Sequence, residues 1–270
     1  MTDTTYPDLL FHRDGEVAVL TLNVPERLNP LTNALQHSLC RALADLAEAR
    51  SVRAVVLTGA GRAFCAGADL SAGFAPDGSG RSRGQQAADT MHTLTNRMVR
   101  DLRALPLPVV CAVNGVAAGG GLGLALAGDV VLAARSAYFY MPFMARLGIV
   151  PDVGSTWFYQ RLLGTGRATA LTLLADRLPA EKAAAWGLIW DCVDDAQLMT
   201  EAMAIARRLA ALPAHAALET RAAFDAAAGH TLTEQLAYEA ERQRELLDRP
   251  EFAEGVQAFL EKRAPSFAPR

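Results

Sequence analysis

Residues 109–128 constrain the fold of this chain more than any other segment. They include one strongly polar residue, Asn114, over a length that could span a bilayer. Glycines interrupt the segment repeatedly, however, and Asn114-Gly115 is a turn signal. We therefore predict a buried strand over residues 109–113, a turn and a buried helix over residues 119–127, and no membrane span.

The chain before this segment alternates between strand and helix patterns. Runs around Asp14-Gly15 predict a β-hairpin over residues 9–13 and 16–22. Strands that alternate with helices favour a mostly parallel sheet, hence an α/β fold. Beyond the hairpin and residues 109–127, we predict helices at 32–50 and 91–105, strands at 54–58 and 130–134, and loops at 59–70 and 71–86.

The C-terminal part of the sequence is mainly helical. The helical pattern begins near residue 154, and four segments follow at 197–212, 214–228, 233–248 and 251–263. We predict an α/β core over residues 1–195 and a C-terminal helical region over residues 196–270.

Charge and composition exclude several classes of function. The net charge of −3 argues against a nucleic-acid binder, which usually carries a basic excess. Four dispersed cysteines and five histidines form no Cys-x-x-Cys or His-Glu-x-x-His motif, so neither a disulfide framework nor a metal site is expected. Residues 1–8 lack a secretory pattern, and we expect a cytoplasmic protein with reduced, buried cysteines.

The loop Ala66-Gly67-Ala68-Asp69 is the first place that could carry chemistry. It follows a predicted strand, and its small residues leave the backbone open to a ligand oxygen. The alternative is an ordinary loop in which Asp69 caps the next helix.

The glycine-rich run at residues 114–123 is the second. The first amides of a helix have no internal partners and favour negative charge, so this run could form an anion or oxyanion site. It matches neither a dinucleotide-binding nor a phosphate-loop motif. The alternative is close packing of helix on strand.

Asp152, between Pro151 and Gly154, is the third. A carboxyl group in apolar surroundings has a raised pKa and can move protons. Tyr140, Phe143 and Trp157 are expected to supply those surroundings. The alternative role for Asp152 is to cap the following helix.

Together, these motifs resemble the enoyl-CoA hydratase/isomerase (crotonase) family in order and spacing. The resemblance covers nearly the whole chain, through residues 25–29, 61–70, 112–121 and 254–263. It implies a ββα superhelical core and C-terminal helices that build trimers, often paired into hexamers. It also implies an acyl-CoA thioester substrate, with coenzyme A as part of the substrate and no separate cofactor.

The resemblance also implies roles for individual residues. The backbone N–H groups of Ala68 and Gly120 would form an oxyanion hole that stabilises the thioester enolate. The residues expected to contact the substrate or its CoA part are Arg27, Leu28, Ala66, Asp69, Leu70, Gly119, Gly123, Tyr140, Phe143, Trp157 and Lys262.

Departures from the family pattern bear on the reaction. Hydratases of this family use two glutamates, and Gly123 and Phe143 stand at those positions here. Asp152 looks like the single carboxylate of the ring-1,2-epoxyphenylacetyl-CoA isomerase and 3,2-enoyl-CoA isomerase branch, although residues 141–146 hold one residue more than is usual there. We therefore expect an isomerase. An enoyl-CoA hydratase and a non-catalytic acyl-CoA binder remain alternatives.

Overall fold

The computed structural model describes residues 5–70, 78 and 80–267, and its core contains two sheets. In the six-stranded sheet all pairs are parallel except β1 with β2, and in the four-stranded sheet all are parallel except β8 with β9. The first sheet has the order β1 (Leu9–Asp14), β2 (Val17–Leu22), β3 (Ala54–Gly59), β5 (Val109–Val113), β7 (Val130–Ala134) and β10 (Asp191–Val193). The second has the order β4 (Ala63–Cys65), β6 (Val116–Ala118), β8 (Tyr138–Tyr140) and β9 (Leu178–Pro179).

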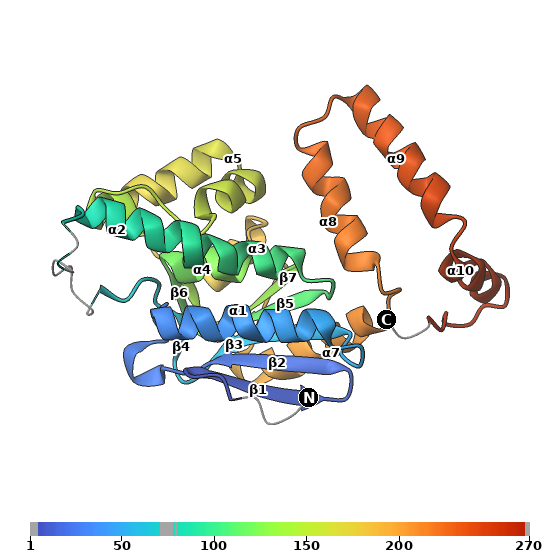
Figure 1. Ribbon diagram of the computed structural model, residues 1–270, viewed down its shortest axis with the longest axis horizontal. Helices are drawn as coiled ribbons and strands as arrows, with labels where there is room; N and C mark the ends of the chain where they lie inside the picture. Colours follow the sequence, from blue (N-terminus) through green and yellow to red (C-terminus); the bar gives the residue numbers. More distant parts are fainter. Residues whose placement is uncertain (1–4, 71–77, 79, 268–270) are drawn as a thin grey trace.

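Most helices form the outer layers of the core or a C-terminal extension, whereas the helix Gly120–Leu126 is buried inside the core (Figure 1). Their bounds are α1 (Asn33–Glu48), α2 (Arg83–Thr90), α3 (Asn96–Ala104), α4 (Gly120–Leu126), α5 (Ser155–Leu174), α6 (Ala180–Ala185), α7 (Leu198–Ala210), α8 (Ala216–Ala227), α9 (Leu232–Leu246) and α10 (Pro250–Leu260). In the part of the chain with described coordinates, no helix is long and apolar enough to cross a membrane.

A ββα unit repeats through the core. In each unit one strand joins the first sheet, the next joins the second, and a helical segment follows, so that β3, β5 and β7 are neighbours, as are β4, β6 and β8. This arrangement confirms the predicted ββα superhelix. The sequence shows no fixed period because the three units begin at Ala54, Val109 and Val130, at unequal intervals.

Two predicted loops contain regular structure. The loop predicted at residues 59–70 includes β4, whose three residues are all buried. In the loop predicted at residues 71–86, α2 begins at Arg83, because Ser82 and Gln85 form a capping box at its N-terminus. Within that loop, residues 71–77 and 79 lie outside the described residues.

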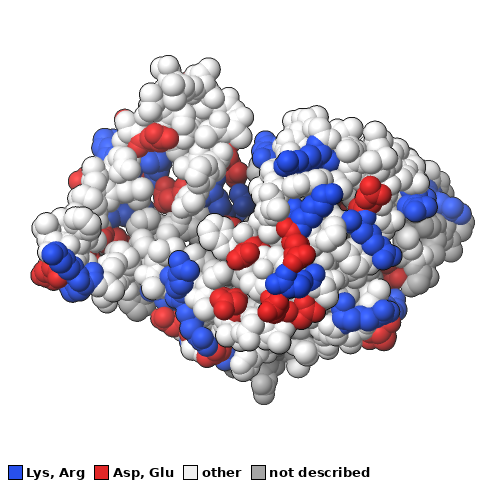
Figure 2. All heavy atoms as spheres, turned by 180° about the vertical axis from the view of Figure 1, so that it is seen from behind, with Lys and Arg blue, Asp and Glu red and all other residues white. Residues whose placement is uncertain are grey.

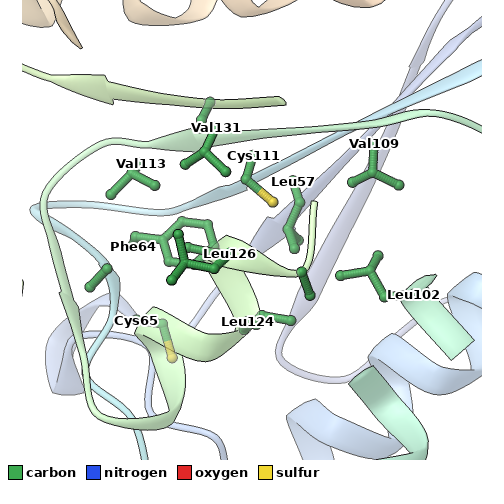
Figure 3. Packing of buried hydrophobic residues seen from close by; sticks show 14 of the residues in the cluster. Leu57, Phe64, Cys65, Leu102, Val109, Cys111, Val113, Leu124, Leu126 and Val131 are labelled. Carbon is green, nitrogen blue, oxygen red and sulfur yellow. The ribbon is translucent and has the colours of Figure 1, made fainter. Parts of the chain in front are cut away.

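Glycines bring α4 against β4. A methyl carbon on Gly121 would lie 2.7 Å from Cβ of Cys65, closer than two carbon atoms can approach. Phe64, Cys65, Leu124 and Leu126 belong to the cluster that joins these elements (Figure 3). Close packing, one of the two roles considered for the glycine run, is therefore present.

The C-terminal helices differ in how they contact the core. α7 packs on it through Ala202, Ala206 and Ala210, which are buried. On α8, Arg221 donates to Asp129 and to three backbone carbonyl oxygens of residues 103–107. α9 and α10 continue away from the sheets (Figure 1).

Candidate active site

The Gly67–Ala68 peptide is held in one orientation by the residue that precedes α1. Leu31 N–H donates to the Gly67 carbonyl oxygen at 2.8 Å, and Leu31 forms a parallel bridge with Ala68. In a trans peptide the N–H points opposite to the carbonyl. Ala68 N–H therefore points away from Leu31, and no hydrogen bond to it is found among the described residues.

The Gly119–Gly120 peptide lies at the start of α4. Gly119 has a φ of 53° and a ψ of −127°, a conformation that glycine adopts more readily than other residues. Its N–H donates to the Tyr140 carbonyl oxygen at 2.9 Å. Gly120 is the first residue of the helix, so its N–H has no intrahelical acceptor.

These two peptides meet at one corner of the core. A methyl carbon on Gly67 would lie 3.0 Å from the Gly120 nitrogen and 2.7 Å from the Ala118 oxygen. Ala68 is exposed and Gly120 is buried, so a ligand oxygen would enter from the Ala68 side. Two amides from different loops at one point is the arrangement that an oxyanion hole requires.

Asp152 lies beside this corner. Its Oδ1 would be 3.7 Å from a methyl carbon placed on Gly120. Burial raises the pKa of its carboxyl group above the ordinary value, opposed by a hydrogen bond from its own backbone N–H. Gly154, not Asp152, is the N-cap of α5, and no side chain caps that helix, so the capping alternative for Asp152 is wrong.

The backbone after Asp152 is strained. Val153 has a φ of 52°, which is rare for a β-branched residue, and Gly154 follows with a φ of 74°. Such a conformation costs about 1–3 kcal/mol and persists only where the surroundings fix it. Here Val153 is buried, and its Cγ2 would lie 2.8 Å from a methyl carbon on Gly120.

The same segment leaves no room for a side chain at position 123. A methyl carbon on Gly123 would lie 2.3 Å from the Val153 oxygen and 2.9 Å from Oγ of Ser155. The hydratase glutamate expected by family resemblance could not fit there unless residues 152–155 moved. The loop that carries Asp152 occupies that space.

An aromatic ring covers the other side of the corner. The Phe143 ring is buried, and its Cζ would lie 3.6 Å from a methyl carbon on Gly119. Phe143 begins a π-helical turn, Phe143–Leu147. A π turn accommodates an additional residue within a helix, which is consistent with the extra residue noted at 141–146.

Several residues expected to bind CoA gather near the mouth of the corner. Arg27 donates to Asp69 at 2.9 Å, and Leu28 accepts a hydrogen bond from Ala66 N–H at 2.9 Å. Leu70 is 52% exposed. The structure therefore brings these expected contact residues together in one pair of loops, with the Arg27 charge paired to Asp69.

Two predicted site residues lie elsewhere. Trp157 lines a cavity of about 810 Å³ with Trp190 and Phe224, and Arg161 stacks on its ring at 3.8 Å. Trp157 therefore does not share a wall with Phe143, because it faces α8. Lys262 follows α10, on the opposite side of the molecule from β6 and α2 (Figure 1).

The sequence patterns missed the residues that hold the corner. Asn29 is fully buried; its side chain accepts from Val24 N–H and donates to the Ala60 and Ala63 carbonyl oxygens. A buried asparagine beside a turn could have indicated this role, whereas the contribution of Leu31 comes from its backbone and has no sequence signal.

Two other groups of side chains do not form a competing site. Burial raises the pKa of the Cys65 thiol to about 12, so Cys65 is not a nucleophile at neutral pH. Acidic and basic side chains are interspersed on the face shown in Figure 2, with no extended basic patch on that face.

Comparison with known proteins gives a consistent family. The family model for enoyl-CoA hydratase/isomerase matches residues 12–270. The chain is 44% identical to 1,2-epoxyphenylacetyl-CoA isomerase of Escherichia coli, over 96% of this chain and 97% of that protein. It is 42% identical to a protein named "Probable enoyl-CoA hydratase" of Rhodobacter capsulatus, over 98% and 100%.

A solved structure agrees with this result. The enoyl-CoA hydratase of Bacillus anthracis superimposes with a TM-score of 0.86 and 32% identity, covering 96% of this chain and 98% of that one. Sequence, fold and the geometry of the corner therefore lead to one conclusion: this chain belongs to the enoyl-CoA hydratase/isomerase family.

Proposed function

We propose that this protein is an acyl-CoA isomerase in which Asp152 moves a proton beside an oxyanion hole formed by Ala68 and Gly120. One observation carries the proposal: Asp152 is next to Gly120, whereas position 123 has no space for a carboxylate. A hydratase that positions water with two glutamates would lack both of them here.

The reaction needs two proton transfers. Asp152, as the carboxylate, accepts a proton from a carbon of the acyl chain, and the C–H electron pair moves into the thioester as an enolate. The N–H groups of Ala68 and Gly120 stabilise the enolate oxygen. Asp152 then returns the proton to a different carbon, so no atom is gained or lost.

The apolar surroundings favour isomerisation over hydration. Phe143 and Val153 are buried on either side of the Gly119–Gly120 peptide. Such walls exclude water from the enolate, because water there would compete for the proton. Burial of Asp152 also raises its pKa toward the range in which it can both accept and return a proton.

The substrate class follows from the relative named an epoxyphenylacetyl-CoA isomerase. We propose an acyl-CoA with a ring or double bond next to the thioester methylene, and a ring-epoxide ester of phenylacetyl-CoA as the first candidate. The product of this reaction would be a CoA ester with a rearranged ring and the same mass as the substrate.

Product analysis tests the proposal against its alternatives. We expect wild-type protein to convert a 3-enoyl-CoA or the phenylacetyl-CoA epoxide into a product of unchanged mass. If a 2-enoyl-CoA instead gained one water, with loss of the conjugated thioester absorbance, the protein would be a hydratase. Binding of these esters without any conversion would indicate a non-catalytic binder.

We also propose that a second copy covers α9 and α10. Phe259 and Leu260 on α10 are 83% and 73% exposed, as expected for an interface that one chain leaves open. In a trimer, Lys262 would lie near a neighbouring copy's site, where it could meet the phosphates of CoA.

A further inference from the structure

A chain of buried hydrogen bonds runs from the start of α3 to the Gly67–Ala68 peptide. The Thr95 hydroxyl donates to Oε1 of Gln36 at 2.7 Å, and Nε2 of Gln36 donates to the Leu31 carbonyl oxygen at 2.9 Å. Leu31 N–H in turn donates to the Gly67 carbonyl oxygen at 2.8 Å.

Both side chains in this chain are buried. Gln36 is 4% exposed and Thr95 is 8% exposed. Polar groups removed from water cost free energy unless they are hydrogen-bonded, so each bond in the chain holds its neighbour in place. Thr95 also ends a π-helical turn, Met91–Thr95, in which Leu94 and Thr95 both face inward. Such turns are often found at functional sites.

The chain ends on the peptide that carries a proposed oxyanion donor. The carbonyl oxygen and the N–H of Leu31 belong to different peptide units, so Gln36 and Thr95 act on Gly67 by fixing the position of the Leu31 backbone. A peptide whose carbonyl accepts a hydrogen bond becomes a stronger N–H donor, and here that donor is Ala68. The orientation of the donor is fixed by the same bond.

We propose that Gln36 and Thr95 are positioning residues for the oxyanion hole, acting through Leu31 on the orientation and strength of Ala68 N–H. This inference rests on the proposed function, because it presumes that Ala68 N–H binds the thioester oxygen. Neither side chain is placed to touch the substrate.

Leu31 links this chain to the second donor as well. Its Cδ1 would lie 3.0 Å from a methyl carbon on Gly120. A shift of Leu31 would therefore move the Gly67–Ala68 peptide relative to Gly120, and the hole depends on the separation of the two amides.

The test compares two buried threonines. Thr95→Val removes the hydroxyl at nearly constant shape. The matched control is Thr58→Val, because Thr58 is also buried and its hydroxyl donates at 2.8 Å to the Ala112 carbonyl oxygen on β5, which is not part of the hydrogen-bond chain to Gly67. Thr95→Ser restores the hydroxyl, and Gln36→Met removes the next link.

Two readouts separate positioning from stability. The first is the infrared stretching frequency of a ¹³C-labelled thioester carbonyl in a bound acyl-CoA, which falls when the oxygen accepts hydrogen bonds. The second readout is steady-state kinetics, from which kcat and KM are determined separately. We expect Thr95→Val and Gln36→Met to move the frequency toward its value in water and to lower kcat about tenfold, with little change in KM.

Thr58→Val should lower the melting temperature by a similar amount but leave the frequency and kcat unchanged, and Thr95→Ser should restore both. The inference is overturned if Thr95→Val and Gln36→Met keep the wild-type frequency and kcat, or if Thr58→Val changes them equally. If the wild-type protein itself shows no frequency shift, the oxyanion hole is absent and the proposed function fails first.

Discussion

The corner that holds Asp152 and the C-terminal helices α9 and α10 are opposite in construction. At the corner, peptides are fixed by hydrogen bonds, and methyl carbons added to Gly67, Gly120 or Gly123 would overlap neighbouring atoms. On α10, the large side chains of Phe259 and Leu260 are mostly exposed, and Gly255 has no neighbour within 4 Å of an added methyl carbon.

This difference shows which parts of the protein one chain can complete. The corner needs no partner, because its donors and its carboxylate come from elements packed in one core. α9 and α10 bury little of their apolar surface within the chain, so their stability should depend on association. Changes at the corner should therefore alter chemistry, and changes on α10 should alter assembly.

Replacing the carboxylate at the corner should have the largest effect. We expect Asp152→Asn to lower kcat for isomerisation about 10³-fold, because an amide cannot accept the proton. Steady-state assays on the candidate esters measure this loss. Asp176→Asn, at an exposed position on the core, is the matched control and should keep wild-type activity. Near-normal activity of Asp152→Asn would assign the proton transfer to another group.

A second variant tests the tightness of the corner. Gly67→Ala should lower kcat about 10²-fold, because its methyl group would meet the Ala118 oxygen and displace the Ala68 donor. Gly15→Ala is the control: Gly15 also has a positive φ, of 60°, but an added methyl group there has no neighbour within 4 Å.

The control variant should lose only about 1 kcal/mol of stability, because an alanine at this positive φ is strained, and it should keep normal activity. Comparing kcat with the free energy of unfolding for both variants separates conformational strain from contact. Equal losses in the two variants would show that the corner is no more crowded than a surface turn.

The sequence predicted the C-terminal helices more completely than it predicted the structure of the corner. The pattern predicted the ends of α7, α8, α9 and α10 to within three residues, because apolar residues recur at helical spacing along an amphipathic helix. It also singled out Asp152 and the glycine run as candidates, and the structure places the two side by side. It missed β4 and β6, each only three residues long, since such short strands are held by their neighbours in the sheet.

The sequence could not show how the corner is held. Leu31 acts through its backbone, and the space at Gly123 is filled by Val153, which is distant in the chain. Proximity in the sequence predicts that Trp157 lies with Phe143, but α5 directs the Trp157 ring toward α8. The position of a residue around the helix, rather than its distance along the chain, determines which way its side chain points.

A charged residue on α10 should break the assembly side of the comparison. We expect Phe259→Glu to shift the protein toward monomer in sedimentation experiments, because an unpaired carboxylate is costly in a buried interface. Leu10→Glu, at a position 52% exposed on β1, is the control and should leave the oligomeric state unchanged. Monomeric wild-type protein would contradict the proposed role of α10.

The smallest expected effect is on stability and follows from the raised pKa of Asp152. The folded state binds this proton more tightly than the unfolded state, so its contribution to stability is present below the ordinary pKa and is lost as pH rises through the folded value. Asp152→Asn should therefore unfold at a higher denaturant concentration than wild type at pH 7. The difference should vanish in acid, below the ordinary pKa of aspartate. A less stable variant at pH 7 would contradict this sign.

Deuterium exchange tests the central claim most directly. Wild-type protein and Asp152→Asn are incubated in deuterium oxide with phenylacetyl-CoA, a stable ester with an acidic methylene group, and the ester is analysed by mass spectrometry. We predict that wild-type protein introduces deuterium next to the thioester and that Asp152→Asn does so no faster than buffer. Exchange at equal rates in both proteins would contradict the assignment of Asp152 as the group that moves the proton.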